Sequence, residues 1–268
     1  MICKKHPNVQ IIMKLFAFAM LSLVPSVTVC SFFSKEVDIY SGTYGNDDVE
    51  VFQPEEVMYH LAGRDGVFYE GAFTFDNYNP DKGGAGNRQG VFSGYSTHFS
   101  STEGTSLGFH CTGLNPGKNS SASKSFIFVM GPWESGEEFV APQVTFQNLG
   151  VLSFIADNMD MIGITDGSTA GTGGGRYGKA DIVSFNNVGN IEFRGLNHGG
   201  IGFSRLNSLA FTNTGDISFT DMKMGYSSNG GAIFINQGGN SSLYSNPGDG
   251  NISFDHTGSI IFRNLVKT

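Results

Sequence analysis

The stretch that decides the fold is Val144-Thr145-Phe146-Gln147-Asn148-Leu149-Gly150-Val151-Leu152-Ser153-Phe154. Its pattern, apolar-x-Phe-x-Asn-x-Gly-x-apolar-x-Phe, returns in 183–193, 209–219 and 252–262, with His256 in place of Asn in the last copy. The defining positions all share one parity, which is the period of a β-strand. Each copy therefore predicts two short strands joined by a bend, which the central Gly supplies.

The repetition of this stretch predicts a solenoid. One copy alone leaves its row of large side chains half in water, whereas stacked copies bury that row between them. The copies start 39, 26 and 43 residues apart. With coils of roughly 20 residues, this spacing predicts two coils, then one coil with an insertion, then two coils. We predict an all-β protein, a right-handed parallel β-helix (solenoid) with a less regular β-rich N-terminal part; the alternative is a sandwich of Phe-rich strands.

The repeat phase predicts the side chains of the interior. We expect four phenylalanines of one phase to be buried and stacked, with neighbouring coils about 4.8 Å apart: Phe146, Phe185, Phe211 and Phe254. Asn148, Asn187 and Asn213 share the parity of these phenylalanines, so we expect them to face inward as well. A lone buried amide is costly, but amides stacked in register can hydrogen-bond to one another and to backbone carbonyls of the next coil.

Composition and charge narrow the class of protein. The 268 residues include 24 Phe and 38 Gly, with only 15% charged residues, which favours strands and tight turns over helices. The net charge of −8 and the sequence pI of about 5.1 argue against nucleic acid as a partner. Hydrophobic residues make up 39% of the chain, enough for a core, so disorder is not expected.

The N-terminal residues 1–31 have the pattern of a secretory signal peptide. Lys14 precedes the apolar run 15–24, which is too short to span a bilayer and is followed by a short polar exit. The alternative is a buried N-terminal helix, and translation could also start at Met13. Removal of 1–31 leaves Cys111 as the only cysteine, and its parity predicts a buried core residue.

Three segments follow from these patterns. Residues 1–31 are the signal peptide, 32–140 form a β-rich cap or degenerate coils, and 141–268 form the repeat region. The repeats stop in mid-pattern, so we expect the region to be truncated. We expect its open last coil to expose a strand edge and apolar side chains, through which copies of the chain self-associate.

No constellation in the sequence predicts catalysis. The segment 173–179 matches two phosphate-loop patterns, but a strand follows it where such a loop needs a helix, so no nucleotide cofactor is expected. Asp157, Asp160, Asp166 and His198 do not recur at one repeat phase, as a site on one face would require, and no His has metal-ligand spacing. We predict no catalytic, cofactor-binding or metal-binding residues; the alternative is a secreted β-helix polysaccharide lyase or hydrolase.

A tetrapeptide adds a family resemblance. Gly230-Gly231-Ala232-Ile233 and the Phe-x-Asn repeats together resemble the polymorphic membrane proteins of Chlamydiae. These are autotransporters whose passengers carry many copies of GGA[ILV] and F-x-x-N on a predicted β-helix. Here the tetrapeptide is complete once, and the second motif is one residue shorter, as F-x-N at Phe75, Phe146, Phe185, Phe211, Phe234 and Phe262.

The resemblance implies a function at a cell surface. It predicts that the chain is the surface-exposed or secreted passenger of an autotransporter-like outer-membrane protein. Such a passenger would be an adhesin that contributes to virulence by binding a host-cell surface protein or glycan. It also predicts export to the cell outer membrane or surface, provided that a longer product supplies the barrel; a chain complete as given would stay periplasmic. A non-functional truncated product is a further alternative.

Overall fold

The structure is a computed structural model that describes residues 35–48, 53–75, 90–116, 124–129, 143–165, 180–203, 206–224, 231–235 and 251–267. The chain divides into two compact units, Met1–Phe33 and Ser34–Thr268, and all described residues belong to the second unit. The predicted signal peptide, 1–31, lies outside the described residues.

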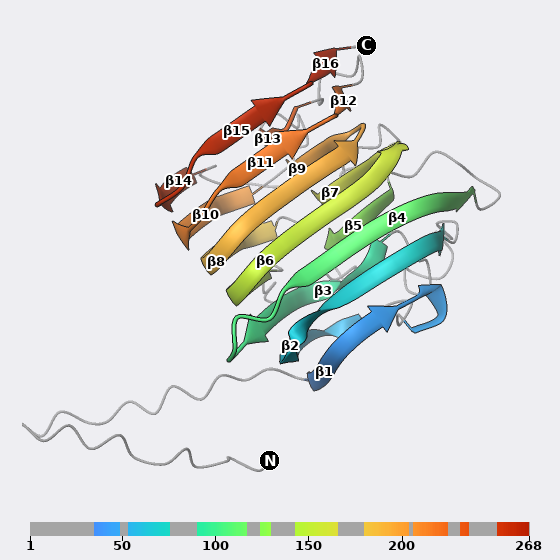
Figure 1. Ribbon diagram of the computed structural model, residues 1–268, viewed down its shortest axis with the longest axis vertical. Helices are drawn as coiled ribbons and strands as arrows, with labels where there is room; N and C mark the ends of the chain where they lie inside the picture. The colour runs from blue at the N-terminus through green and yellow to red at the C-terminus, as the bar shows by residue number, and fades with distance from the viewer. Residues whose placement is uncertain are drawn as a thin grey trace, which may run out of the picture. The chain divides into compact units, whose positions relative to one another are not determined.

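The described residues are all-β, as the sequence predicts. They form strands and a single turn of 3-10 helix, η1 (Asn46–Asp48). Every pairing between described strands is parallel, so no hairpin of the kind found in a sandwich occurs among them. Figure 1 shows strands that are distant in sequence lying side by side in this unit.

The strands pair in three main ladders, which we call the first, second and third ladder. The first contains parts of β1 (Lys35–Tyr44), β2 (Gln53–Phe75), β3 (Gly90–Ser101), β6 (Gln143–Met159) and β8 (Ala180–Leu196), with β10 (Leu206–Thr214) and β14 (Asn251–His256). The second contains the later parts of β1, β2, β6 and β8, with β4 (Leu107–Pro116), β11 (Ile217–Thr220) and β15 (Ile260–Arg263). The third contains the start of β3, with β5 (Lys124–Val129), β7 (Met161–Thr165), β9 (Gly199–Phe203) and β13 (Ile233–Ile235). A short fourth pairing joins β12 (Lys223–Met224) to β16 (Val266–Lys267).

One passage of the chain through the three ladders is called a coil below. The strands β2 and β6 each bend round the corner between the first and second ladders, so each pairs with β3 before the bend and with β4 after it. These four strands consequently close a ring of parallel pairings. The strands described within 35–129 thus join the same ladders as the repeats.

Neighbouring copies of the repeat occupy neighbouring coils. Phe185 lies opposite Phe146 on one side and Phe211 on the other, and Phe211 lies opposite Phe254. The prediction of two coils per copy, made from the 39- and 43-residue spacings, is therefore wrong. The additional residues are in sequence segments that separate strands of different ladders, for example 166–179 between β7 and β8, and the described strands pair directly all the same.

Two columns of stacked aromatic rings fill the core. In the first ladder, ring centroids are 5.1 Å apart for Phe146 and Phe185, 4.7 Å for Phe185 and Phe211, and 4.8 Å for Phe211 and Phe254. The first three rings are fully buried, which confirms their predicted positions. The prediction that Phe254 is buried is wrong: the residue is 41% exposed, because within the described residues only the preceding coil covers its ring.

The second column follows the second ladder. The rings of Phe109, Phe154, Phe193 and Phe219 are stacked at 5.0 to 5.1 Å and are fully buried. The two columns meet edge to face, with 6.0 Å between the centroids of Phe146 and Phe154. Offset stacking along a column and edge-to-face contact between columns are the favoured geometries of aromatic pairs, so the core gains stability beyond the burial of area alone.

Substitutions in the first-ladder column should show that a ring in the middle contributes more to stability than the ring at its end. We expect Phe185→Ala to lower the free energy of unfolding by about 3–5 kcal/mol, since it leaves a cavity between two covered rings. Phe254→Ala, the matched control, should cost clearly less, because that ring is stacked on one side only. Urea unfolding of the two variants measures the difference. Equal losses would contradict the importance of coil-to-coil stacking.

Candidate functional site

The repeat asparagines form a hydrogen-bonded column on the outside of the molecule. Asn148, Asn187 and Asn213 lie at the corner between the first and second ladders, with φ of 57°, 54° and 50°. The amide Nδ2 of Asn187 donates to Oδ1 of Asn148 at 2.9 Å, and Nδ2 of Asn213 donates to Oδ1 of Asn187 at 3.0 Å. The amides therefore bond to one another across coils, on the outer surface. The prediction that they donate to backbone carbonyls of the next coil is not met in these two bonds, whose acceptors are amide oxygens.

The predicted inward orientation of these asparagines is wrong. Asn187 and Asn213 are exposed and Asn148 is half-buried, while the next residues, Leu149 and Val188, are buried. The left-handed conformation turns the chain at Asn, so the following residue faces inward instead of the Asn itself. Asn tolerates this conformation better than other non-Gly residues, so it supplies the bend that the sequence assigns to Gly.

The glycines of the repeat have a different role. Gly150, Gly189 and Gly215 lie one above another, and a Cβ atom on Gly189 or Gly215 would collide with the carbonyl oxygen of the glycine in the preceding coil. None of these three glycines has a positive φ. They are required because the backbones of neighbouring coils approach closely at this corner, not because the chain turns there.

A groove runs along the corner beside the asparagine column. Its volume is about 410 Å³, and its lining includes the three asparagines together with Thr102 and Thr257. No lining residue carries a charge. Asn187, the middle amide of the column, uses one N–H and one oxygen lone pair on its two neighbours, which leaves a second N–H and a second lone pair for a ligand. The groove thus offers a row of neutral donors and acceptors, with one pair per coil.

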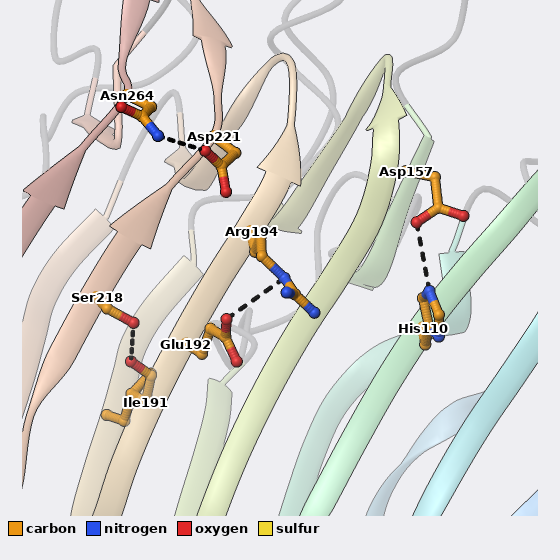
Figure 2. Close-up of polar contacts among 8 residues, drawn as sticks. All are labelled: His110, Asp157, Ile191, Glu192, Arg194, Ser218, Asp221 and Asn264. Atoms are coloured by element: carbon orange, nitrogen blue, oxygen red, sulfur yellow. Dashed lines mark hydrogen bonds and ion pairs between the residues drawn. The ribbon is translucent and has the colours of Figure 1, made fainter.

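A second corner repeats the arrangement between the second and third ladders. Asn158, Gly195, Asp221 and Asn264 have φ of 56°, 68°, 54° and 54°. Nδ2 of Asn264 donates to Oδ1 of Asp221 at 2.8 Å, as Figure 2 shows. Sequence reasoning missed this column. The sequence does contain a signal for it: in three of the four copies, the residue two positions after the second Phe is a Gly, Asp or Asn.

The described histidines do not cluster with several acids. His60 pairs with Glu36 at 3.7 Å, and His110 pairs with Asp157 at 3.4 Å across neighbouring coils of the second ladder (Figure 2). Of the acids singled out in the sequence, Asp157 thus meets a His. Asp160 likewise lies 3.9 Å from His198, whereas Asp166 lies outside the described residues, as does the glycine-rich segment 173–179. Each pair stands alone, and no group of three His, Cys, Asp or Glu in the described ranges could hold a metal ion.

Among the described histidines that pair with an acid, only His98 has a side chain that is almost fully buried. Its ring nitrogens lie 2.9 Å from Oε1 of Glu56 and 2.8 Å from Oγ1 of Thr145. Burial lowers the pKa of His98 below its ordinary value, and the carboxylate of Glu56 opposes that effect without cancelling it. His98 is therefore held neutral in the folded chain at pH values where a free histidine begins to gain a proton.

This burial predicts a loss of stability in mild acid. A folded pKa below the unfolded value of about 6.5 means that the unfolded state binds the proton more readily. The contribution is fully present above about pH 6.5 and is lost as the pH falls from there toward the folded pKa. Urea unfolding of the native chain should show this slope, and His98→Gln should show a flatter one. Identical slopes would contradict the assignment to His98.

The family tetrapeptide lies on the third ladder. Ile233 pairs with Ile201, and the carbonyl oxygen of Ala232 accepts hydrogen bonds from the N–H groups of Gly200 and Ile201 at 2.9 and 3.2 Å. The partial copy of the motif, 199–201, is therefore stacked directly on Gly231–Ile233; Gly230 lies outside the described residues. Its glycines permit close approach of backbones, since a Cβ on Gly199 would lie 2.6 Å from the carbonyl oxygen of Gly231.

The remaining predicted motif residue is Phe262. It is stacked on Phe219 at 5.4 Å but is 59% exposed. In the last copy, His256 pairs with Thr214 and does not continue the asparagine column, so the column ends at Asn213. The groove is accordingly a feature of the coils between Thr102 and Thr257.

Comparison with known proteins gives no match: no family model, no curated protein and no solved structure is similar to this chain. Within the part of the chain that the structure describes, no helix is long and apolar enough to cross a membrane.

Proposed function

We propose that the chain is a right-handed parallel β-helix in which each copy of the repeat forms one coil. Three observations support this fold: the parallel pairing, the return of the chain to the same ladders coil after coil, and the unbroken aromatic columns. The right hand follows from the strong preference of parallel crossover connections for that hand.

We further propose that this β-helix is the adhesive passenger of an autotransporter-like surface protein and has no catalytic activity. The observation that carries the proposal is the uncharged groove along the asparagine column. Its ligand is a host-cell surface molecule, and a neutral glycan fits best among the host proteins and glycans that could bind. Sugar hydroxyls both donate and accept hydrogen bonds, as do the free amide positions of the column.

The distribution of charge supports binding over catalysis. Hydrolysis or elimination on a polysaccharide needs two or more acidic or basic groups that converge on one bond. Among the described residues, each acid that forms an ion pair does so with a single His or Arg, as Glu192 does with Arg194 at 3.4 Å on the outer face of the second ladder (Figure 2). The groove itself has no ionisable side chain in its lining. On this proposal the protein is exported and acts at the outer surface of the cell.

A cell-binding assay tests the proposal. Fluorescent beads coated with the purified chain should bind cultured epithelial cells, and removal of cell-surface glycans with glycosidases should abolish binding. Asn187→Gly should weaken binding about tenfold, because it deletes the central amide of the groove while keeping a residue that adopts a positive φ easily.

The matched control is Asn158→Gly. Asn158 has almost the same φ, but it lies at the second corner and does not line the groove, so its variant should bind like the native chain. Absence of binding by native beads would contradict adhesion. Equal loss in both variants would place the binding site elsewhere, and resistance to glycosidases with sensitivity to protease would identify a protein receptor.

Two substitutions of Asn187 separate its backbone conformation from its hydrogen bonding in the asparagine column. We expect Asn187→Gly to cost about 1 kcal/mol, because two solvent-exposed hydrogen bonds are lost. Asn187→Leu should cost about 1–2 kcal/mol more, since leucine must also adopt the left-handed conformation. Urea unfolding midpoints provide the comparison. A glycine variant less stable than the leucine variant would show that the positive φ is not what Asn is needed for.

A further inference from the structure

The last coil exposes an apolar surface that the other described coils do not. Six large hydrophobic side chains are exposed in the described residues, and four of them belong to this coil: Ile252, Phe254, Phe262 and Val266. Their exposed fractions run from 41% to 59%. In the preceding coils, the residues that pair with the first three of them, Leu209, Phe211 and Phe219, are completely buried. The repeat thus places core residues where, within the described residues, no coil covers them.

The strand edges of this coil are also open. Within the described ranges β14 pairs only with β10, β15 only with β11, and β16 only with β12. An edge strand with unpaired N–H and C=O groups beside exposed aromatic rings is a template for another strand. The surface therefore combines backbone hydrogen-bonding groups with an apolar face, which is the combination that strand addition requires.

The opposite end of the ladders has a different chemical character. In β1 the outward side chains Glu36, Asp38 and Tyr40 are exposed, while Ile39 is buried and Val37 is half-buried. Asp38 and Asp255 belong to one outward column, linked coil by coil through His60, Ser100, Gln147, Asn186 and Thr212. Stacking the first coil of one copy on the last coil of another in this register would place the two carboxylates about 4.8 Å apart, which is unfavourable.

We propose that the surface of the last coil binds the same surface of a second copy of this chain, forming a two-fold symmetric dimer. Apolar side chains then meet apolar side chains, and the assembly stops at two copies because the same surface is used by both. A two-fold axis reverses strand direction, so the two β14 edges pair antiparallel. This interaction is independent of any ligand in the groove.

The sequence of β14 favours one register. With the two-fold axis at Ser253, Phe254 lies opposite Ile252 of the partner subunit, and both face the interior. Asp255 then lies opposite the partner's Asn251, whose amide can donate to the carboxylate. The two Ser253 side chains face each other on the outer surface, close enough for a cysteine pair at this position to form a disulfide.

Sedimentation of the purified full chain at micromolar concentration tests the dimer. The native chain should sediment with twice the mass of one chain. The double variant Phe254→Glu, Phe262→Glu should dissociate about 100-fold more readily, since it places four charges in the interface. Far-UV circular dichroism establishes that this variant keeps its strands. A monomeric native chain, or a variant that stays dimeric, would overturn the proposal.

Crosslinking tests the register in a background with Cys3→Ser and Cys30→Ser, which leaves only the buried Cys111. Ser253→Cys should give a disulfide-linked dimer under mild oxidation. Ala210→Cys, in the same outward column but one coil further in, should not. Oligomers that grow without limit as concentration rises would indicate head-to-tail stacking and would overturn the two-fold arrangement.

Discussion

The structure depends on register between parallel coils. A slip of one residue in any strand would turn its phenylalanines outward and its polar residues inward, because side chains alternate along a strand. In the correct register, rings lie on rings at about 5 Å in both aromatic columns, and the remaining columns of side chains are aligned by the same register. The asparagine bonds, the glycine contacts and the stacked third-ladder motif all join residues that the same register brings together. The core and the surface are thus consequences of one constraint.

The corner shows how this constraint produces the groove that we propose as a binding site. The chain must turn where the first ladder meets the second, and Asn adopts the required left-handed conformation while its amide reaches the next coil. Glycine two residues later lets the backbones approach. Together they leave a groove lined by neutral amides, hydroxyls and backbone. The side chains that stabilise the corner are therefore the ones that a ligand would meet, which links stability to recognition at the same residues.

Charge is dispersed over this molecule instead of being concentrated. Salt bridges join single acids to single bases on the outside of the ladders, and exposed pairs of this kind contribute little to stability. The apolar surface, in contrast, is concentrated in the last coil. Two surfaces of different character result: an uncharged groove with amide and hydroxyl groups along the corner, and an apolar surface at one end. The first suits hydrogen bonding to a soluble or surface glycan, and the second suits another strand edge.

The sequence by itself determined the all-β class and the phase of the buried phenylalanines, because a period of two and a repeated Phe report directly on which side chains face the core. Tertiary structure decided the rest. The pattern did not reveal the outward Asn. The alternation of inward and outward residues shifts by one at Asn148 and again before Leu152, and the two shifts cancel, so Phe146 and Leu152 still have the same parity. The number of coils depended on residues between ladders, which no pattern reveals. His98 meets Glu56 and Thr145 from strands 42 and 47 residues away, and only the stacking of coils brings such groups together.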